Sequence, residues 1–169
     1  MKTYQEFMLE CSQLDESGLS RIKSKSDKGG VAILSGSRGD KSSKENKARA
    51  KQLDRDIKGR GLPGATKVSG RWDEKDKKTG ETKKVKERSH VVTSGKMGKR
   101  KFSDTIKKLG KKYDQDAVLI QKKKTGTLSA TRKGGLGKDK RVRAGTMKPG
   151  RTSAQGDTKI KGKTFTYEK

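Results

Sequence analysis

The sequence predicts an α+β fold: a small ferredoxin-like domain of order β-α-β-β-α-β, the split βαβ arrangement. Short apolar runs over 31–35, 66–72, 88–94 and 116–121 have the length and composition of strands. Two segments with apolar residues at helical spacing lie between these runs. We therefore expect two helices to cover one face of a small antiparallel sheet, with residues 127–131 as a further edge strand.

The first helical segment has clear start and stop signals, and the second has a clear helical periodicity. The first, about 43–58, begins with Ser42 and Glu45 in the spacing of a capping box and ends before Gly59. The second, about 101–113, carries apolar residues at i, i+4, i+7 and i+11, namely Phe102, Ile106, Leu109 and Tyr113. These four residues, on one face, are expected to pack against the sheet.

The composition along the chain divides it into four parts. Residues 1–16 read as an amphipathic N-terminal helix, and residues 17–30 as a flexible linker rich in Ser, Gly and Lys. The compact α+β domain is expected over 31–131. A basic, largely irregular arm rich in Gly, Lys and Arg follows over 132–169, and residues 164–167 could return to the sheet as an edge strand.

The charge of the chain favours a polyanionic partner. Among 169 residues, 46 are Lys or Arg and 20 are Asp or Glu, so the formal net charge is +26. Each phosphate that such a surface neutralises releases a counterion, which favours nonspecific contact with nucleic acid, above all DNA. An anionic membrane or an acidic protein would be the competing partners, and the apolar runs are too short to span a membrane.

The basic arm and the turn before it supply the candidate binding residues. Glycines between the cations would let the backbone follow a phosphate surface. The candidate nucleic-acid-binding residues are Lys122, Lys123, Lys124, Arg132, Lys133, Lys138, Lys140, Arg141, Arg143, Lys148 and Arg151.

Patterns for catalysis or cofactor binding are weak. The turn over 36–42 lies between a strand and a helix, but Asp40 stands where a phosphate-binding loop needs glycine before Lys41. The chain has one histidine, His90, inside an expected strand, and one cysteine, Cys11, so a zinc site lacks ligands. We therefore expect no enzyme, no cofactor, no metal and no small-molecule substrate. A concave pocket around His90 with a carboxylate in reach would argue otherwise.

Two resemblances add to this interpretation. The opening Met1-Lys2-Thr3-Tyr4-Gln5-Glu6-Phe7-Met8-Leu9-Glu10 resembles the start of internal head proteins of T-even-like tailed phages. In that group a short N-terminus directs the protein into the assembling prohead, and a protease then cuts after a glutamate, which here would be Glu10 or Glu16. The helix with Glu45-Asn46 and Arg49, and the strand Ala117-Val118-Leu119-Ile120, look like a small uncharacterised domain of bacteria and phages.

Together these observations predict a phage-encoded basic protein that is packaged in the capsid, bound nonspecifically to DNA, and delivered with the genome. Its place would be the virion interior or the host cytoplasm, and the prohead scaffold would be a further partner. An alternative of another class is a host-directed protein that docks on an acidic or nucleic-acid-handling host factor and inhibits or redirects it.

Overall fold

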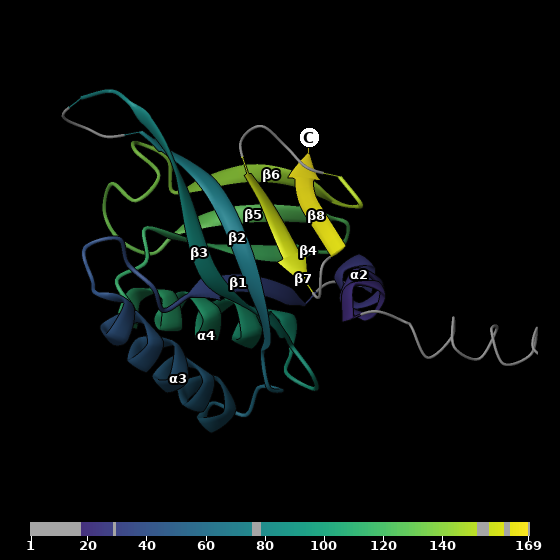
Figure 1. The fold of residues 1–169 in the computed structure, drawn as a ribbon. Coiled ribbons are helices and arrows are strands. Elements are labelled where there is room, and N and C mark those ends of the chain that lie inside the picture. Colours follow the sequence, from purple (N-terminus) through teal and green to yellow (C-terminus); the bar gives the residue numbers. More distant parts are fainter. Residues whose placement is uncertain (1–17, 29, 76–78, 152–155, 161–162, 169) are drawn as a thin grey trace, which may run out of the picture.

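In the part of the chain that the structure describes, eight strands close into an antiparallel barrel and three helices pack on it (Figure 1). This computed structural model describes residues 18–28, 30–75, 79–151, 156–160 and 163–168. The helices are α2 (Gly18–Lys28), α3 (Ser43–Gly59) and α4 (Lys99–Lys112). The strands are β1 (Val31–Ser35), β2 (Thr66–Lys75), β3 (Thr82–Thr93), β4 (Ala117–Lys122), β5 (Thr125–Ala130), β6 (Arg141–Pro149), β7 (Gly156–Ile160) and β8 (Lys163–Glu168). Their order around the barrel is β1-β3-β2-β7-β8-β6-β5-β4.

Strand β1 is buried on both faces, like much of its neighbour β4. All five residues of β1 are buried. Val31 and Ile33 belong to the apolar cluster inside the barrel, whereas Ala32 and Leu34 belong to the cluster beneath the helices. Strands covered on both faces carry continuous apolar runs, and this is why both strands could be identified in the sequence.

Helices α3 and α4 cover the outer face of β1, β3 and β4 (Figure 1). Helix α3 begins with the expected capping box, in which the Ser42 hydroxyl accepts from the Glu45 amide and the Glu45 carboxylate accepts from the Ser42 amide. The core beneath the helices consists of Ala32, Leu34, Leu53, Ile57, Leu62, Val92, Phe102, Ile106, Leu109, Tyr113, Val118 and Ile120. The four apolar residues of the second predicted helix are therefore core residues.

Helix α2 closes one end of the barrel, where β1 begins (Figure 1). Its side chains Leu19 and Ile22 are 4% and 5% exposed and pack inside the barrel with Val31 and Phe165. Spacing of three residues between these two side chains puts them on one helical face. The sequence suggested a flexible linker over 17–30, and the structure places this plug helix there.

The ferredoxin-like prediction is wrong, because the sheet closes on itself and has no free edge. The expected strands and both helices are present, but β6, β7 and β8 add a further wall made from the segment expected to be an irregular arm. Strand β8 pairs with β6 on one side and β7 on the other, so it is not an edge strand. Closure leaves no unpaired strand exposed. The other barrel strands are β1, β4, β5 and the long hairpin of β2 and β3.

The predicted helix over 1–16, with Glu10 and Glu16, lies outside the described residues, so this prediction and that of proteolytic processing stay untested. Among the described helices, none is both long and apolar enough to cross a membrane.

We expect Ile22→Ala to lower the free energy of unfolding by about 2–4 kcal/mol, because it removes buried apolar volume from the plugged end of the barrel. Denaturant unfolding measures this change. Arg21→Ala, an exposed position on the same helix, serves as the control and should change stability by less than about 0.5 kcal/mol. Equal effects of the two substitutions would show that α2 does not close the barrel.

Candidate active site

The end of the barrel away from α2 opens into a cavity of about 800 Å³. Small-molecule sites commonly have volumes of about 300–1,000 Å³. The apolar floor of the cavity includes Ile33 of β1, Leu119 of β4 and Leu128 of β5. Its charged lining residues are Arg38, Asp40, Lys41, Lys47, Lys86, Glu87, Arg88, Asp114, Asp116 and Arg132. The cavity thus combines an apolar interior with a rim that carries both signs of charge.

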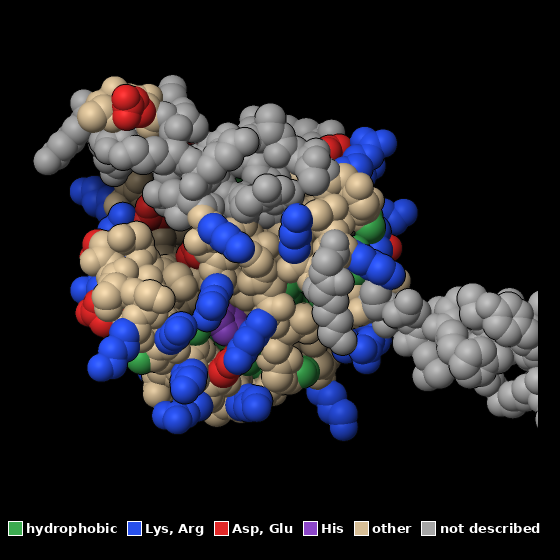
Figure 2. All heavy atoms as spheres, viewed as in Figure 1, with side chains coloured by type: hydrophobic (Ala, Val, Ile, Leu, Met, Phe, Trp, Pro, Cys, Tyr) green, Lys and Arg blue, Asp and Glu red, His purple; other side chains and the backbone are tan. Residues whose placement is uncertain are grey.

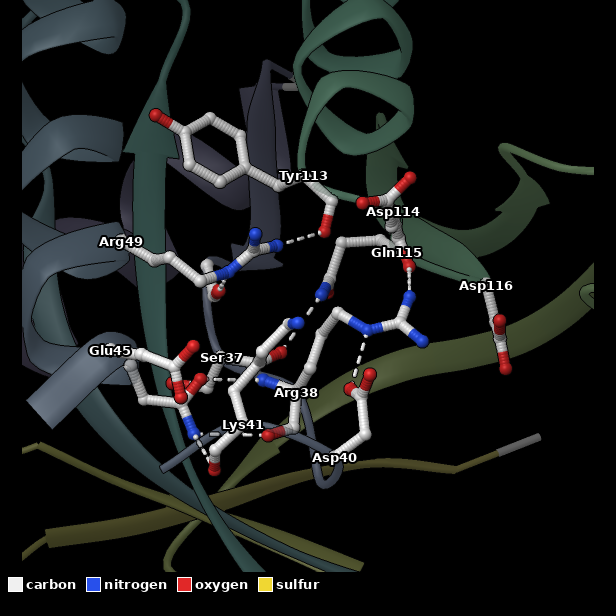
Figure 3. Close-up of polar contacts among 12 residues, drawn as sticks. Ser37, Arg38, Asp40, Lys41, Glu45, Arg49, Tyr113, Asp114, Gln115 and Asp116 are labelled. Carbon is white, nitrogen blue, oxygen red and sulfur yellow. Dashed lines mark hydrogen bonds and ion pairs between the residues drawn. The ribbon is translucent and has the colours of Figure 1, made fainter. Parts of the chain in front are cut away.

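The backbone that leaves β1 is fixed at this rim by Gln115 (Figure 3). The Ser35 amide donates to Gln115 Oε1 at 3.3 Å, and Gln115 Nε2 donates to the Ser37 carbonyl at 3.2 Å. The buried Ser35 hydroxyl donates to the Arg88 carbonyl at 2.7 Å and accepts from the Ser37 amide at 3.0 Å. One amide side chain and one hydroxyl therefore join this segment to α4 and β3.

Helix α3 holds the same segment through Arg49 and Asn46 (Figure 3). Arg49 Nε donates to the Gly36 carbonyl at 2.7 Å, and its Nη2 donates to the Tyr113 carbonyl at 2.6 Å. Asn46 accepts from the Arg38 amide at 2.9 Å and donates to the Arg38 carbonyl at 3.0 Å. These contacts satisfy buried backbone groups that no strand partner reaches.

Gln115 is brought to β1 by the way α4 ends. The Gln115 amide donates to the Gly110 carbonyl at 2.9 Å, and the Asp114 amide donates to the Lys111 carbonyl at 3.1 Å. Asp114 has a φ of 53°, and this pair of bonds around a left-handed residue is a Schellman motif. Aspartate tolerates that conformation better than most residues. The sharp reversal returns the chain to the barrel with Gln115 beside β1.

Arg38 is an ordered cation at the rim (Figure 3). Its Nε donates to Asp40 Oδ1 at 2.8 Å, and its Nη1 donates to the Asp114 carbonyl at 2.8 Å. The hydrogen bond from Arg38 holds the pKa of the Asp40 carboxyl below its usual range, and the same bond raises the pKa of Arg38. Both groups are therefore charged at neutral pH.

The loop between β5 and β6 forms another side of the cavity. The Thr131 hydroxyl donates to the Gln115 carbonyl, and Arg132 forms an ion pair with Asp116. A Cβ atom at Gly135 would lie 2.0 Å from the Asp116 carbonyl oxygen, so any other residue would push this loop away. Glycine allows the close approach that keeps the loop at the rim.

Glu87 is the carboxylate that the barrel wall contributes. Alternate residues of a strand face the same side, so Glu87 faces the same side of β3 as Ser89 and Val91. Val91 belongs to the cluster inside the barrel, and Glu87 is half-buried and lines the cavity. Its carboxylate therefore stands at the mouth, beyond the apolar floor.

The residues predicted to bind nucleic acid do not form one surface. Lys122, Lys123 and Lys124 form the turn between β4 and β5, on the α2 side of the barrel, whereas Arg132 to Arg141 lie at the cavity side. Arg143 and Lys148 follow on β6, and Arg151 comes after it. Of the predicted set, Arg132 lines the cavity. Figure 2 shows Lys and Arg side chains on much of the visible face, with several of them around the histidine.

His90 lies away from the cavity, on the outer face of β3 beneath α3. It is 1% exposed, and its Nε2 lies 3.2 Å from Asp54 Oδ1. Burial lowers the pKa of its imidazole. A carboxylate is thus in reach, but His90 is not among the residues lining the cavity, so it is not a candidate for catalysis there. Among the described residues, no cluster of three His, Cys, Asp or Glu could hold a metal ion.

Comparison with known proteins identifies the family. Residues 32–169 match the family described as the S-adenosylmethionine lyase family. The chain belongs to this family. A similar solved structure is a phage SAM lyase in complex with S-methyl-5'-thioadenosine, 19% identical, at a TM-score of 0.37, covering 69% of this chain and 91% of that chain. That likeness is too distant to assign roles to residues here. No curated protein matches the chain.

Membership of the lyase family corrects the functional predictions. The resemblance to internal head proteins was misleading, because it covered about ten residues, whereas the lyase match spans 32–169. The match also includes the helix and strand assigned above to an uncharacterised domain. An enzyme family contradicts the packaged DNA-binding protein, the host-directed alternative and the expectation of no enzyme. The expected nucleic-acid, scaffold and host-protein partners, the absence of a small-molecule substrate and the virion interior are withdrawn with them.

Sequence reasoning missed Arg38, Glu87 and Gln115 as members of one site. The turn over 36–42 was considered and set aside, because its spacing does not fit a phosphate-binding loop. It borders the cavity for a different reason, since it follows an inner strand at the open end of the barrel. The available signal was that polar residues follow the buried strand β1 and precede the buried strand β4. Because the two strands are antiparallel, these residues lie at the same end of the barrel.

Helices α3 and α4 are joined by Asp56. Its Oδ2 accepts from Lys112 Nζ at 2.6 Å and from the Tyr113 hydroxyl at 2.7 Å. Its Oδ1 accepts from Gln52 at 3.2 Å. The bond from Lys112, with those from Tyr113 and Gln52, lowers the pKa of Asp56. Burial and then the bond to Asp56 raise the pKa of the Tyr113 hydroxyl.

We expect Asp56→Asn to lower the free energy of unfolding at pH 7 by about 1–3 kcal/mol, because it removes a charged hydrogen-bond acceptor. The folded-state pKa is depressed, so the carboxylate stabilises the fold above its ordinary pKa of about 3.9 and loses that effect as the pH falls through the lower folded value. The gap between the two proteins should therefore close in acid. Denaturant unfolding between pH 7 and pH 3 measures it, with the exposed Asp104→Asn as control. A gap independent of pH would contradict this assignment.

Proposed function

We propose that this chain cleaves the Cγ–S bond of S-adenosylmethionine in the barrel-mouth cavity and releases S-methyl-5'-thioadenosine. The observation that carries the proposal is that every residue lining the cavity, from Ile33 to Leu136, lies within the stretch that matches the lyase family. The activity would take place in the cytoplasm of a host cell, where the substrate is made.

The reaction can proceed within the substrate alone. The carboxylate oxygen attacks Cγ, the new C–O bond closes a five-membered lactone, and the C–S bond breaks with its electron pair moving to sulfur. The sulfonium becomes the neutral thioether of S-methyl-5'-thioadenosine, and the other product is protonated homoserine lactone. Atoms and charge balance without water or an oxidant. Holding the tail of the substrate in the folded conformation supplies the main rate gain open to the protein.

The cavity is suited to a cationic nucleoside. Adenosine would pack on the apolar floor formed by Ile33, Leu119 and Leu128, while the amino-acid tail would lie at the charged rim. The reacting carboxylate and sulfonium lose their opposite charges in the transition state, so replacing bulk water around them favours reaction. Glu87, at the mouth, would attract the sulfonium into a chain whose net charge of +26 repels it.

The purified chain should convert S-adenosylmethionine into S-methyl-5'-thioadenosine and homoserine lactone. In water labelled with ¹⁸O, lactone trapped early should carry no label, because both of its oxygens come from the substrate. Mass spectrometry of the products measures this. Label in the hydroxyl oxygen of homoserine would indicate attack by water on Cγ, and absence of cleavage would overturn the proposed function.

We expect Glu87→Gln to raise KM for S-adenosylmethionine about tenfold or more with a smaller change in kcat, since Glu87 attracts charge already present in the bound substrate. Binding of the neutral product S-methyl-5'-thioadenosine should change little. Glu81→Gln, an exposed position outside the cavity, is the matched control. An equal loss of affinity for the cation and for the neutral product would show that Glu87 does not recognise the sulfonium.

A further inference from the structure

Arg38 is oriented by two hydrogen bonds before any ligand arrives, whereas Arg132, also at the rim, is exposed and is paired with Asp116. Among the cavity-lining cations Lys41, Lys47, Lys86 and Arg88 are exposed, and flexible exposed cations lose conformational entropy when they bind. The Arg38 side chain is 26% exposed. Two of its three guanidinium nitrogens are held, Nε by Asp40 and Nη1 by the Asp114 carbonyl, each at 2.8 Å.

The third nitrogen of Arg38 is available to a ligand. Within the described part of the chain no hydrogen bond is made by Nη2, and in Figure 3 this nitrogen has no dashed contact and extends toward the side where Asp116 lies. Arg38 and Asp116 both line the cavity. A fixed guanidinium with a carboxylate on the same rim has the charge pattern that an α-amino acid head group requires, since its carboxylate and ammonium are neighbours.

The support behind Arg38 is independent of a ligand. Its own amide and carbonyl are bonded to Asn46, and the preceding residue, Ser37, is bonded to Gln115. The backbone position is therefore fixed from α3 and from the end of α4, and the guanidinium is fixed by Asp40 and Asp114. A donor held in this way binds an anion without first having to be ordered.

We propose that Arg38 binds the α-carboxylate of the substrate through Nη2 and orients it toward Cγ. This inference rests on the proposed function and adds to it the residue that places the attacking group. Only one carboxylate oxygen is needed for the hydrogen bond, so the other stays available to attack. In this arrangement the ammonium group would lie at the rim that also carries Asp116, which is paired with Arg132.

Two uncleaved ligands separate this role from a general effect on the cavity. S-adenosylhomocysteine carries the amino-acid tail but no sulfonium, and S-methyl-5'-thioadenosine lacks the tail. Calorimetric titration of both into the unaltered chain, Arg38→Gln and the exposed control Arg55→Gln gives the comparison. We expect Arg38→Gln to weaken S-adenosylhomocysteine binding about tenfold or more, the loss of one charged hydrogen bond, and to leave S-methyl-5'-thioadenosine binding unchanged. Arg55→Gln, with the same loss of charge, should change neither.

Arg38→Lys keeps the charge but cannot make the fork to Asp40 and Asp114, so its loss for S-adenosylhomocysteine should be intermediate, and it serves if Arg38→Gln does not fold. For S-adenosylmethionine the same series should lower kcat as well as raise KM. Equal weakening of both ligands, or no weakening of either, would overturn the inference for Arg38 while leaving the proposed function intact. If the unaltered chain binds neither ligand and cleaves no S-adenosylmethionine, the proposed function itself fails.

Discussion

The cavity depends on one short stretch of backbone, the residues Gly36 to Arg38 that follow β1, together with Ser35 at the end of that strand. This stretch leaves the barrel where no neighbouring strand can pair with it, so its amides and carbonyls need partners from elsewhere. Gln115, Arg49 and Asn46 provide them from the end of α4 and from α3. Gln115 and Arg49 each bond to two backbone groups, and Asn46 bonds to three. Loss of one of them would therefore release the rim on which the charged side chains stand.

This arrangement explains why the helices lie on one side of the barrel. They are packed on β1, β3 and β4 through a core that ends in Tyr113, and the polar contacts to the rim start where that core stops. Arg49 links the two parts, because its guanidinium reaches the Gly36 and Tyr113 carbonyls and lies 5.6 Å from the Tyr113 ring. The apolar core beneath the helices therefore fixes where the polar side chains of the cavity rim are placed.

Strands and helices whose apolar residues are buried could be predicted from the sequence. The closure of the strands into a barrel could not. The apolar run of β1 and the periodicity of α4 carry their structure in local sequence. Strand β6 does not, because none of the described helices covers its outer face and its inner face contributes few apolar side chains, with Met147 buried. The sequence of such a strand therefore lacks a strand pattern and looks like a basic, irregular segment. Its high content of Lys, Arg and Gly reflects an outer wall in water, and it was mistaken for a binding arm.

The site was beyond reach for a related reason. Arg38, Glu87 and Gln115 are far apart in the sequence and belong to no spaced motif. Pairing of β1 with β3 on one side and β4 on the other brings them to one edge of the sheet, and the loop after β5, which the prediction did not place, completes the cavity there. The net charge of +26 pointed away from a cationic substrate, since the average charge of a surface says little about a partly enclosed cavity with its own carboxylates.

Helix α2 lies outside the stretch that matches the lyase family, yet its apolar face fills the end of the barrel where β1 begins. The barrel-mouth cavity lies at the opposite end from α2, so under the proposed function substrate would enter and both products would leave through this mouth. With the nucleoside seated deepest, the amino-acid fragment would have to depart first. Release of the thioether nucleoside would then limit turnover, because the next substrate molecule could not bind until it had left.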